Sequence, residues 1–165
     1  MTVDHSVATL QGALRELWLS VAELVLSTND DQPFESDLAS AEHVAQLAVE
    51  IQGRLAEALT LFAAGPPTSP EDALRALAGV ERLVREVELI YWRDLRAYGP
   101  VSDLRGSTRR RSGAWPSWWS GVEQSLERCE EPLVAVGRAV GAAWYELANL
   151  PTIATTTTNI TRRSS

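Results

Sequence analysis

The sequence predicts an all-α protein, an elongated up-down-up-down four-helix bundle. Along four long segments, apolar residues recur at alternating spacings of three and four, the heptad pattern of helices that pack side by side. Polar connectors containing proline or glycine separate the four segments, an organisation typical of antiparallel bundles. No segment shows the strict alternation of a strand. We therefore expect one bundle over residues 1–149, followed by a flexible tail rich in Thr and Ser over residues 150–165.

The first two helices are expected over residues 4–27 and 37–64. Ser36 is a suitable N-cap for the second helix, because a serine oxygen accepts hydrogen bonds from first-turn N–H groups. Gly65 and the two prolines after it end that helix. The predicted inward stripe of the first helix is Val7, Leu10, Leu14, Leu17, Val21 and Leu24. That of the second helix is Val44, Ala48, Ile51, Leu55, Ala58 and Phe62.

The third and fourth helices are expected over residues 70–98 and 116–149. Ser69 and Pro70 form a favourable start for the third helix, with serine as the cap and proline at the first position. Its predicted stripe is Leu77, Val80, Val84, Val87 and Tyr91. That of the fourth helix is Val122, Leu126, Cys129, Leu133, Val136, Val140 and Leu147. We expect a bend or break near Pro132, since a proline inside a helix costs about 3 kcal/mol.

Charge is unevenly distributed along the chain, whose formal net charge is −7. Residues 1–100 carry 7 Arg against 16 Asp and Glu, whereas residues 101–115 carry 4 Arg against one Asp. An acidic body therefore carries one basic connector. On the helix faces, acid–arginine pairs at i,i+4 spacing are expected to form weak surface ion pairs: Glu50/Arg54, Glu71/Arg75 and Glu81/Arg85.

Composition excludes several classes of protein. One cysteine cannot form an internal disulfide, and two histidines with one cysteine fall short of the four ligands of a structural zinc site. No apolar run reaches the roughly 20 residues of a membrane-spanning helix, so we expect a cytoplasmic protein. Bundle di-iron sites need Glu-x-x-His motifs, and the chain has none. Cys129 falls at a core position with no histidine near it in sequence. We expect no catalytic residues, no cofactor and no metal.

The most distinctive segment is the Arg/Trp connector, residues 105–119. Arginine binds phosphates and tryptophan stacks on nucleic-acid bases, so the two together are typical of single-strand binding sites. The same two residues are also enriched at protein-interface hot spots. Contact with an anionic membrane surface is a third use. A purely structural interpretation is also open, in which Trp115 and Trp118 close the end of the core and the arginines neutralise acidic helix ends. The candidate binding residues are Arg105, Arg109, Arg110, Arg111, Trp115, Trp118 and Trp119.

We therefore expect a non-enzymatic interaction or adaptor module that presents a helix face or the connector to another protein or to a copy of itself. Trp18, Trp92 and Trp144 lie beside the main stripes and would form an exposed patch if the core does not need them. The alternative is a regulatory module that binds an anionic ligand or single-stranded nucleic acid through the connector. The acidic body disfavours nucleic acid, because it repels phosphates. No motif assigns the chain to a family.

Overall fold

A computed structural model describes residues 3–30, 38–62, 69–98 and 114–149 of the chain, and all of its regular elements there are helical. These elements are α1 (Val3–Asn29), α2 (Leu38–Thr60), α3 (Pro70–Leu89), the π-helical segment η2 (Ile90–Leu95) and α4 (Ala114–Asn149). The predicted tail 150–165 and most of the basic connector lie outside the described residues.

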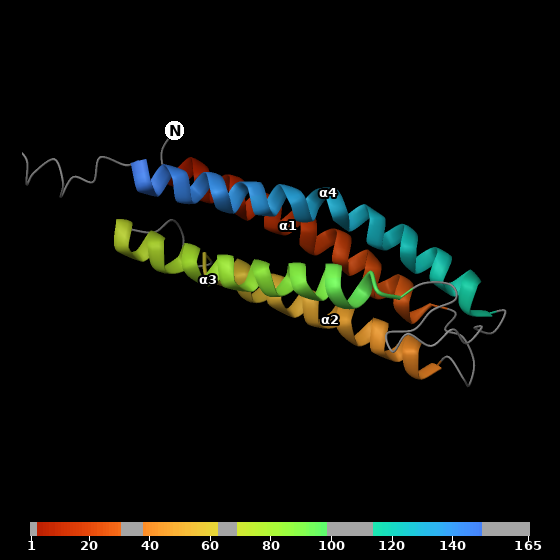
Figure 1. Ribbon diagram of the computed structural model, residues 1–165. Helices are drawn as coiled ribbons and strands as arrows, with labels where there is room; N and C mark the ends of the chain where they lie inside the picture. The colour runs from red at the N-terminus through yellow and green to blue at the C-terminus, as the bar shows by residue number, and fades with distance from the viewer. Residues whose placement is uncertain (1–2, 31–37, 63–68, 99–113, 150–165) are drawn as a thin grey trace, which may run out of the picture.

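The four helices form an elongated bundle in which each runs antiparallel to the one before it (Figure 1). α1 packs against α2 and α4, and α3 packs against the same two helices from the opposite corner. The longest helix, α4, has 36 residues, which corresponds to about 54 Å at the α-helical rise. The all-α, up-down-up-down bundle predicted from the heptad pattern is confirmed.

One continuous apolar core runs between the four helices. Every residue of the four predicted stripes is buried in it, from Val7 at one end of α1 to Leu147 near the end of α4. The stripes lie on the inside because residues three and four apart share one face of a helix. Burying a single Leu, Val or Ile side chain contributes about 1.5–3 kcal/mol, so the shared core provides the main stabilisation of the fold.

The start of α3 follows local sequence rules. Ser69 has an extended backbone, and its hydroxyl accepts a hydrogen bond from the Asp72 backbone N–H at 3.1 Å. Pro70 occupies the first position, where its missing N–H has no helical partner to lose. The predicted cap is therefore confirmed. The corresponding prediction for Ser36 lies outside the described residues.

Two helix predictions need correction. α4 continues as one helix through Pro132, so the break expected there as an alternative to a bend is absent. A proline removes one backbone hydrogen bond, and burial of Cys129 and Leu133 on either side of it in the core offsets that cost. The expected third helix, 70–98, changes from α to π geometry at Ile90. There the Arg96 N–H donates to the Tyr91 carbonyl, five residues earlier, at 3.0 Å.

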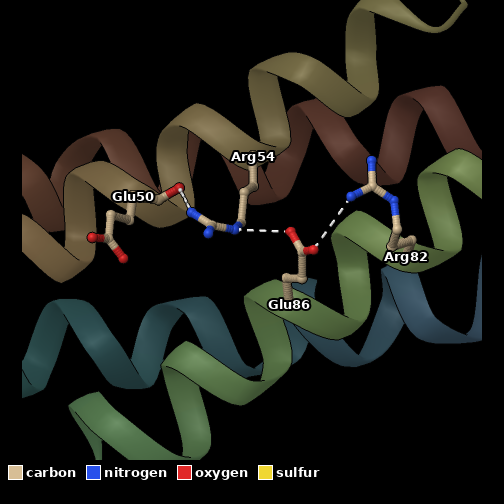
Figure 2. A network of polar contacts seen from close by, with 4 residues as sticks. All are labelled: Glu50, Arg54, Arg82 and Glu86. Carbon is tan, nitrogen blue, oxygen red and sulfur yellow. Dashed lines mark hydrogen bonds and ion pairs between the residues drawn. The ribbon is translucent and has the colours of Figure 1, made fainter.

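Ion pairs link the helices differently from the predicted i,i+4 pattern. Only Glu81 and Arg85 pair as expected, at 2.6 Å. Arg54 instead reaches across to α3, where its Nε donates to Glu86 at 3.0 Å, while its Nη1 contacts only the backbone carbonyl of Glu50 (Figure 2). Arg82 approaches the other oxygen of Glu86 at 3.4 Å. One carboxylate thus joins two arginines at the seam between α2 and α3.

The Glu71/Arg75 pair is also replaced by another. Arg75 approaches Asp72 at 3.5 Å, and both side chains are exposed. Pairs this exposed contribute at most about 1 kcal/mol. We conclude that burial, and not surface charge, determines the arrangement of the helices.

Truncating a core leucine tests this conclusion. Leu126→Ala removes a fully buried side chain, and we expect the free energy of unfolding to fall by about 2–5 kcal/mol. Val134→Ala on the exposed side of the same helix is the matched control, with an expected change within about 0.5 kcal/mol. Chemical denaturation followed by circular dichroism measures both. Equal losses in the two variants would contradict the assignment of the core face.

Candidate functional site

The three tryptophans of the Arg/Trp connector lie inside the bundle. Trp115, Trp118 and Trp119 occupy the first turns of α4, and all three are buried. Their indole faces are therefore covered in this conformation, as the structural reading of the connector requires. Arg105, Arg109, Arg110 and Arg111 lie outside the described residues. The structure thus brings the three tryptophans together, and binding by the complete connector stays a prediction.

These tryptophans belong to an aromatic cluster that closes one end of the core. The cluster consists of His43, Tyr98, Trp115, Trp118 and Trp119, which come from α2, the end of the third helical segment and α4. Trp115 and Trp119 are nearly parallel, with ring centroids 6.1 Å apart. Tyr98 contacts both of them and forms a 2.5 Å hydrogen bond with Nδ1 of His43. The cluster therefore fastens three of the four helical segments to one another.

The polar atoms of the cluster differ in how they are satisfied. Trp119 Nε1 donates to the Glu123 carboxylate at 3.1 Å, one helical turn away. The Nε1 of Trp118 is buried and has no hydrogen-bond partner within the described segments. A buried unpaired donor costs about 1–3 kcal/mol, so Trp118 is held in the cluster by apolar contact, whereas Tyr98 and Trp119 also form hydrogen bonds.

Tyr91 connects the π-helical segment to α4. Its hydroxyl lies 2.7 Å from the Leu126 carbonyl oxygen and 3.1 Å from Glu130 Oε1, and it has a single proton to donate. Arg96 approaches the same Glu130 oxygen at 3.8 Å. Burial, followed by the nearby charge of Glu130, raises the pKa of Tyr91 far above its usual range. Tyr91 therefore stays neutral and acts as a tether between the two elements.

Trp92, the neighbour of the buried Tyr91, is 50% exposed. Its ring meets the Tyr91 ring edge-on at 4.7 Å between centroids, so the tethered tyrosine holds the indole in place. Leu89, three residues earlier, is 53% exposed. π-Helical turns are frequent at functional sites, because they alter the direction of side chains along a helix. Of the three tryptophans that were expected to form an exposed patch if the core did not need them, Trp92 is exposed, while Trp18 and Trp144 are partly buried against the core.

Arginines border this patch. Arg85 lies one turn and Arg82 two turns before Leu89, and both are more exposed than the acids with which they pair, Glu81 and Glu86. Arg93 follows Trp92 and pairs with its neighbour Asp94, whose pKa is lowered by that hydrogen bond. The Leu89/Trp92 surface, which we define as Leu89, Trp92, Arg82, Arg85 and Arg93, therefore exposes two apolar side chains and three cationic heads. From the sequence, Trp92 was expected as a surface candidate and Arg85 only as the ion-pair partner of Glu81, whereas Leu89, Arg82 and Arg93 were not singled out.

Partly buried glutamates lie at seams between helices and accept hydrogen bonds there. Glu81 accepts from Trp144 Nε1 of α4 while it pairs with Arg85, and Glu130 accepts from Tyr91. These contacts stabilise the packing of α3 against α4.

Cys129 is a buried core residue. Its thiol donates to the Ser125 carbonyl oxygen of the preceding turn at 3.3 Å. Burial raises the pKa of the Cys129 thiol to about 12, and the charges of Glu23 and Glu130 act in the same direction. A thiol with so high a pKa is a poor nucleophile near neutral pH.

A small apolar recess lies between Phe62, Ala73 and Leu147, at the end of the bundle opposite the aromatic cluster. Within the described segments, no group of three or more His, Cys, Asp or Glu side chains is placed to hold a metal ion. None of the described helices is long and apolar enough to cross a membrane.

Comparison with known proteins does not add a relative. No family model matches the chain, and neither a curated protein nor a solved structure is significantly similar to it.

Removing the Tyr91 hydroxyl tests its role as a tether. We expect Tyr91→Phe to lower the free energy of unfolding by about 1–3 kcal/mol, because Leu126 and Glu130 lose a buried donor. Tyr145→Phe, whose hydroxyl lies on an exposed side chain of α4, is the control and should be neutral. Thermal and chemical unfolding measure the difference. A neutral Tyr91→Phe variant would show that ring packing alone holds η2 to α4.

The pKa of Cys129 predicts how stability depends on pH. The folded-state pKa of about 12 lies above the usual thiol value of 9.0, so the unfolded chain loses the thiol proton first. This contribution to stability is fully present below pH 9 and is lost as the pH rises from about 9 to 12, at about 1.4 kcal/mol per pH unit. Cys129→Ala should flatten the stability profile over that interval, as urea unfolding at each pH would show. Parallel profiles for the two proteins would contradict the assignment.

Proposed function

We propose that the protein is a non-enzymatic interaction module that binds another protein through the Leu89/Trp92 surface. The observation that carries the proposal is the exposure of Trp92. Five of the six tryptophans are buried or partly buried, whereas Trp92 leaves half of its area to solvent. Exposure of an indole beside a leucine is unfavourable in water, and a partner that buries both side chains would gain binding free energy.

The composition of the surface supports the same proposal. Tryptophan and arginine are the residues most enriched at the energetic centres of protein interfaces. The Tyr91 tether holds the Trp92 ring, so little conformational entropy would be lost when a partner covers it. Because the arginine heads are the most exposed charges around the patch, the partner should bring an apolar centre with an acidic rim.

The alternative, recognition of an anionic ligand or single-stranded nucleic acid by the connector, has weaker support. It needs Trp115, Trp118 and Trp119 as stacking platforms, and all three are buried. The net charge of −7 also repels phosphates. The four connector arginines still provide positive charge for such a ligand. As part of the proposal, we place the module in the cytoplasm.

Partner capture tests the proposal. Immobilised wild-type chain and Trp92→Ala are each exposed to lysate, and the retained proteins are identified and then purified for titration. We expect one protein to bind the wild type and to bind Trp92→Ala at least tenfold more weakly, as befits a hot-spot tryptophan. Tyr145→Ala, a more exposed aromatic residue on α4, is the matched control and should bind like the wild type.

Two outcomes would count against the Leu89/Trp92 surface. Equal binding by Trp92→Ala and the wild type would move the interface to another face. Recovery of nucleic acid that is released steeply by added salt would favour the connector alternative, because phosphate contacts weaken strongly with ionic strength. A protein interface centred on Trp92 should respond little to the same salt.

A further inference from the structure

The outward face of α1 has two large apolar side chains with no cover. Leu26 is 71% exposed and Leu19 is 60% exposed. They lie seven residues apart, two helical turns, and therefore on one face. That face is opposite the buried stripe that includes Leu17, Val21 and Leu24. Neither leucine contributes to the core of its own bundle.

These leucines belong to a second heptad stripe along α1. The outer stripe consists of Ala8, Gly12, Arg15, Leu19, Ala22 and Leu26, at the alternating spacings of four and three that are typical of a helix–helix seam. A side chain built at Gly12 would meet no atom within 4 Å, so the space above this glycine is open. α1 thus has an inner seam that its own bundle buries and an outer seam that faces solvent.

The outer stripe is complementary to itself when two copies run antiparallel. With a two-fold axis at Leu19, residues equally distant before and after Leu19 face each other across the axis. Arg15 and Glu23 lie four residues to either side, so opposite charges meet twice. Gly12 and Leu26 lie seven residues to either side, so the largest exposed side chain meets the open space above a glycine.

The charges favour this orientation over the parallel one. In a parallel pair, Arg15 would face Arg15 and Glu23 would face Glu23. Arg15 has no ion-pair partner among the described residues, and the approach of Glu23 to Arg128 is long, at 3.9 Å, with both side chains exposed. Both groups are therefore available to a second copy. The net charge of −7 opposes association only over the screening length, about 8 Å at physiological salt.

We propose that the outer stripe of α1 binds the same stripe of a second copy of this chain, antiparallel, with Leu19 at the two-fold axis. Apolar contact of Leu19 and Leu26 drives the association, and the Arg15–Glu23 pairs fix the register. This surface is independent of the Leu89/Trp92 surface, since α1 and α3 occupy opposite corners of the bundle. A dimer therefore presents two copies of the Leu89/Trp92 surface at once.

Charge reversal provides a direct test. The wild type should dimerise with rising concentration in sedimentation equilibrium. Arg15→Glu alone places like charges at both pairs, and Glu23→Arg alone does the same, so each variant should self-associate at least tenfold more weakly. An equimolar mixture of the two variants restores opposite charges at both pairs and should dimerise like the wild type. Arg75→Glu, an exposed site on α3, is the control and should leave dimerisation unchanged.

Cross-linking gives a second readout that does not depend on high affinity. Leu19→Cys places two thiols at the two-fold axis, and we expect a covalent dimer under mild oxidation, while Val134→Cys on α4 should stay monomeric. The native Cys129 is buried and should not compete. A monomeric wild type at all concentrations, a mixture that fails to dimerise while both variants are folded, or equal cross-linking of the two cysteine variants would each overturn the proposal. Trp92→Ala should dimerise normally, which separates this result from the fate of the proposed function.

Discussion

Burial of four apolar stripes in one shared core is the interaction on which the rest of the structure depends. Each helix is apolar on one side only, and no helix can remove that side from water without its neighbours. The shared core fixes the rotation of every helix about its own axis. Once that rotation is fixed, Trp92 and the outer stripe of α1 can only face solvent. The surfaces available for recognition are thus a by-product of core formation.

Polar contacts act mainly at the seams, where they join helices that the core has already placed. Glu86 joins α2 to α3 through Arg54, and Glu130 joins α4 to η2 through Tyr91. Both carboxylates are partly buried, and water therefore screens their interactions less than those of fully exposed pairs. On the outward faces of α1, α3 and η2, large apolar side chains stay exposed to solvent and can meet another molecule.

Heptad spacing alone was sufficient to predict the fold class and the inward face of all four helices, since periodicity reports which side of a helix is apolar. It could not predict the π-helical turn at Ile90, because that turn depends on how Tyr91 meets α4. The break predicted near Pro132 is absent because helix propensity describes an isolated helix, and tertiary packing overrides it in the bundle. The sequence could not show which of Trp92 and Trp144 is exposed. Trp144 donates to Glu81, which is 63 residues away in the chain, and this contact exists only once the helices have packed.

The antiparallel order of the helices places Val3 and Asn149 at the same end of the bundle (Figure 1). Since α1 and α4 are direct neighbours, a pulling force applied between these two residues would separate them like a zipper. The contacts between α1 and α4 would break one helical turn at a time. In a shear geometry, by contrast, all of these contacts would bear the force together. A bundle with so extended a core is therefore mechanically weak along the direction in which a force on these two residues would act.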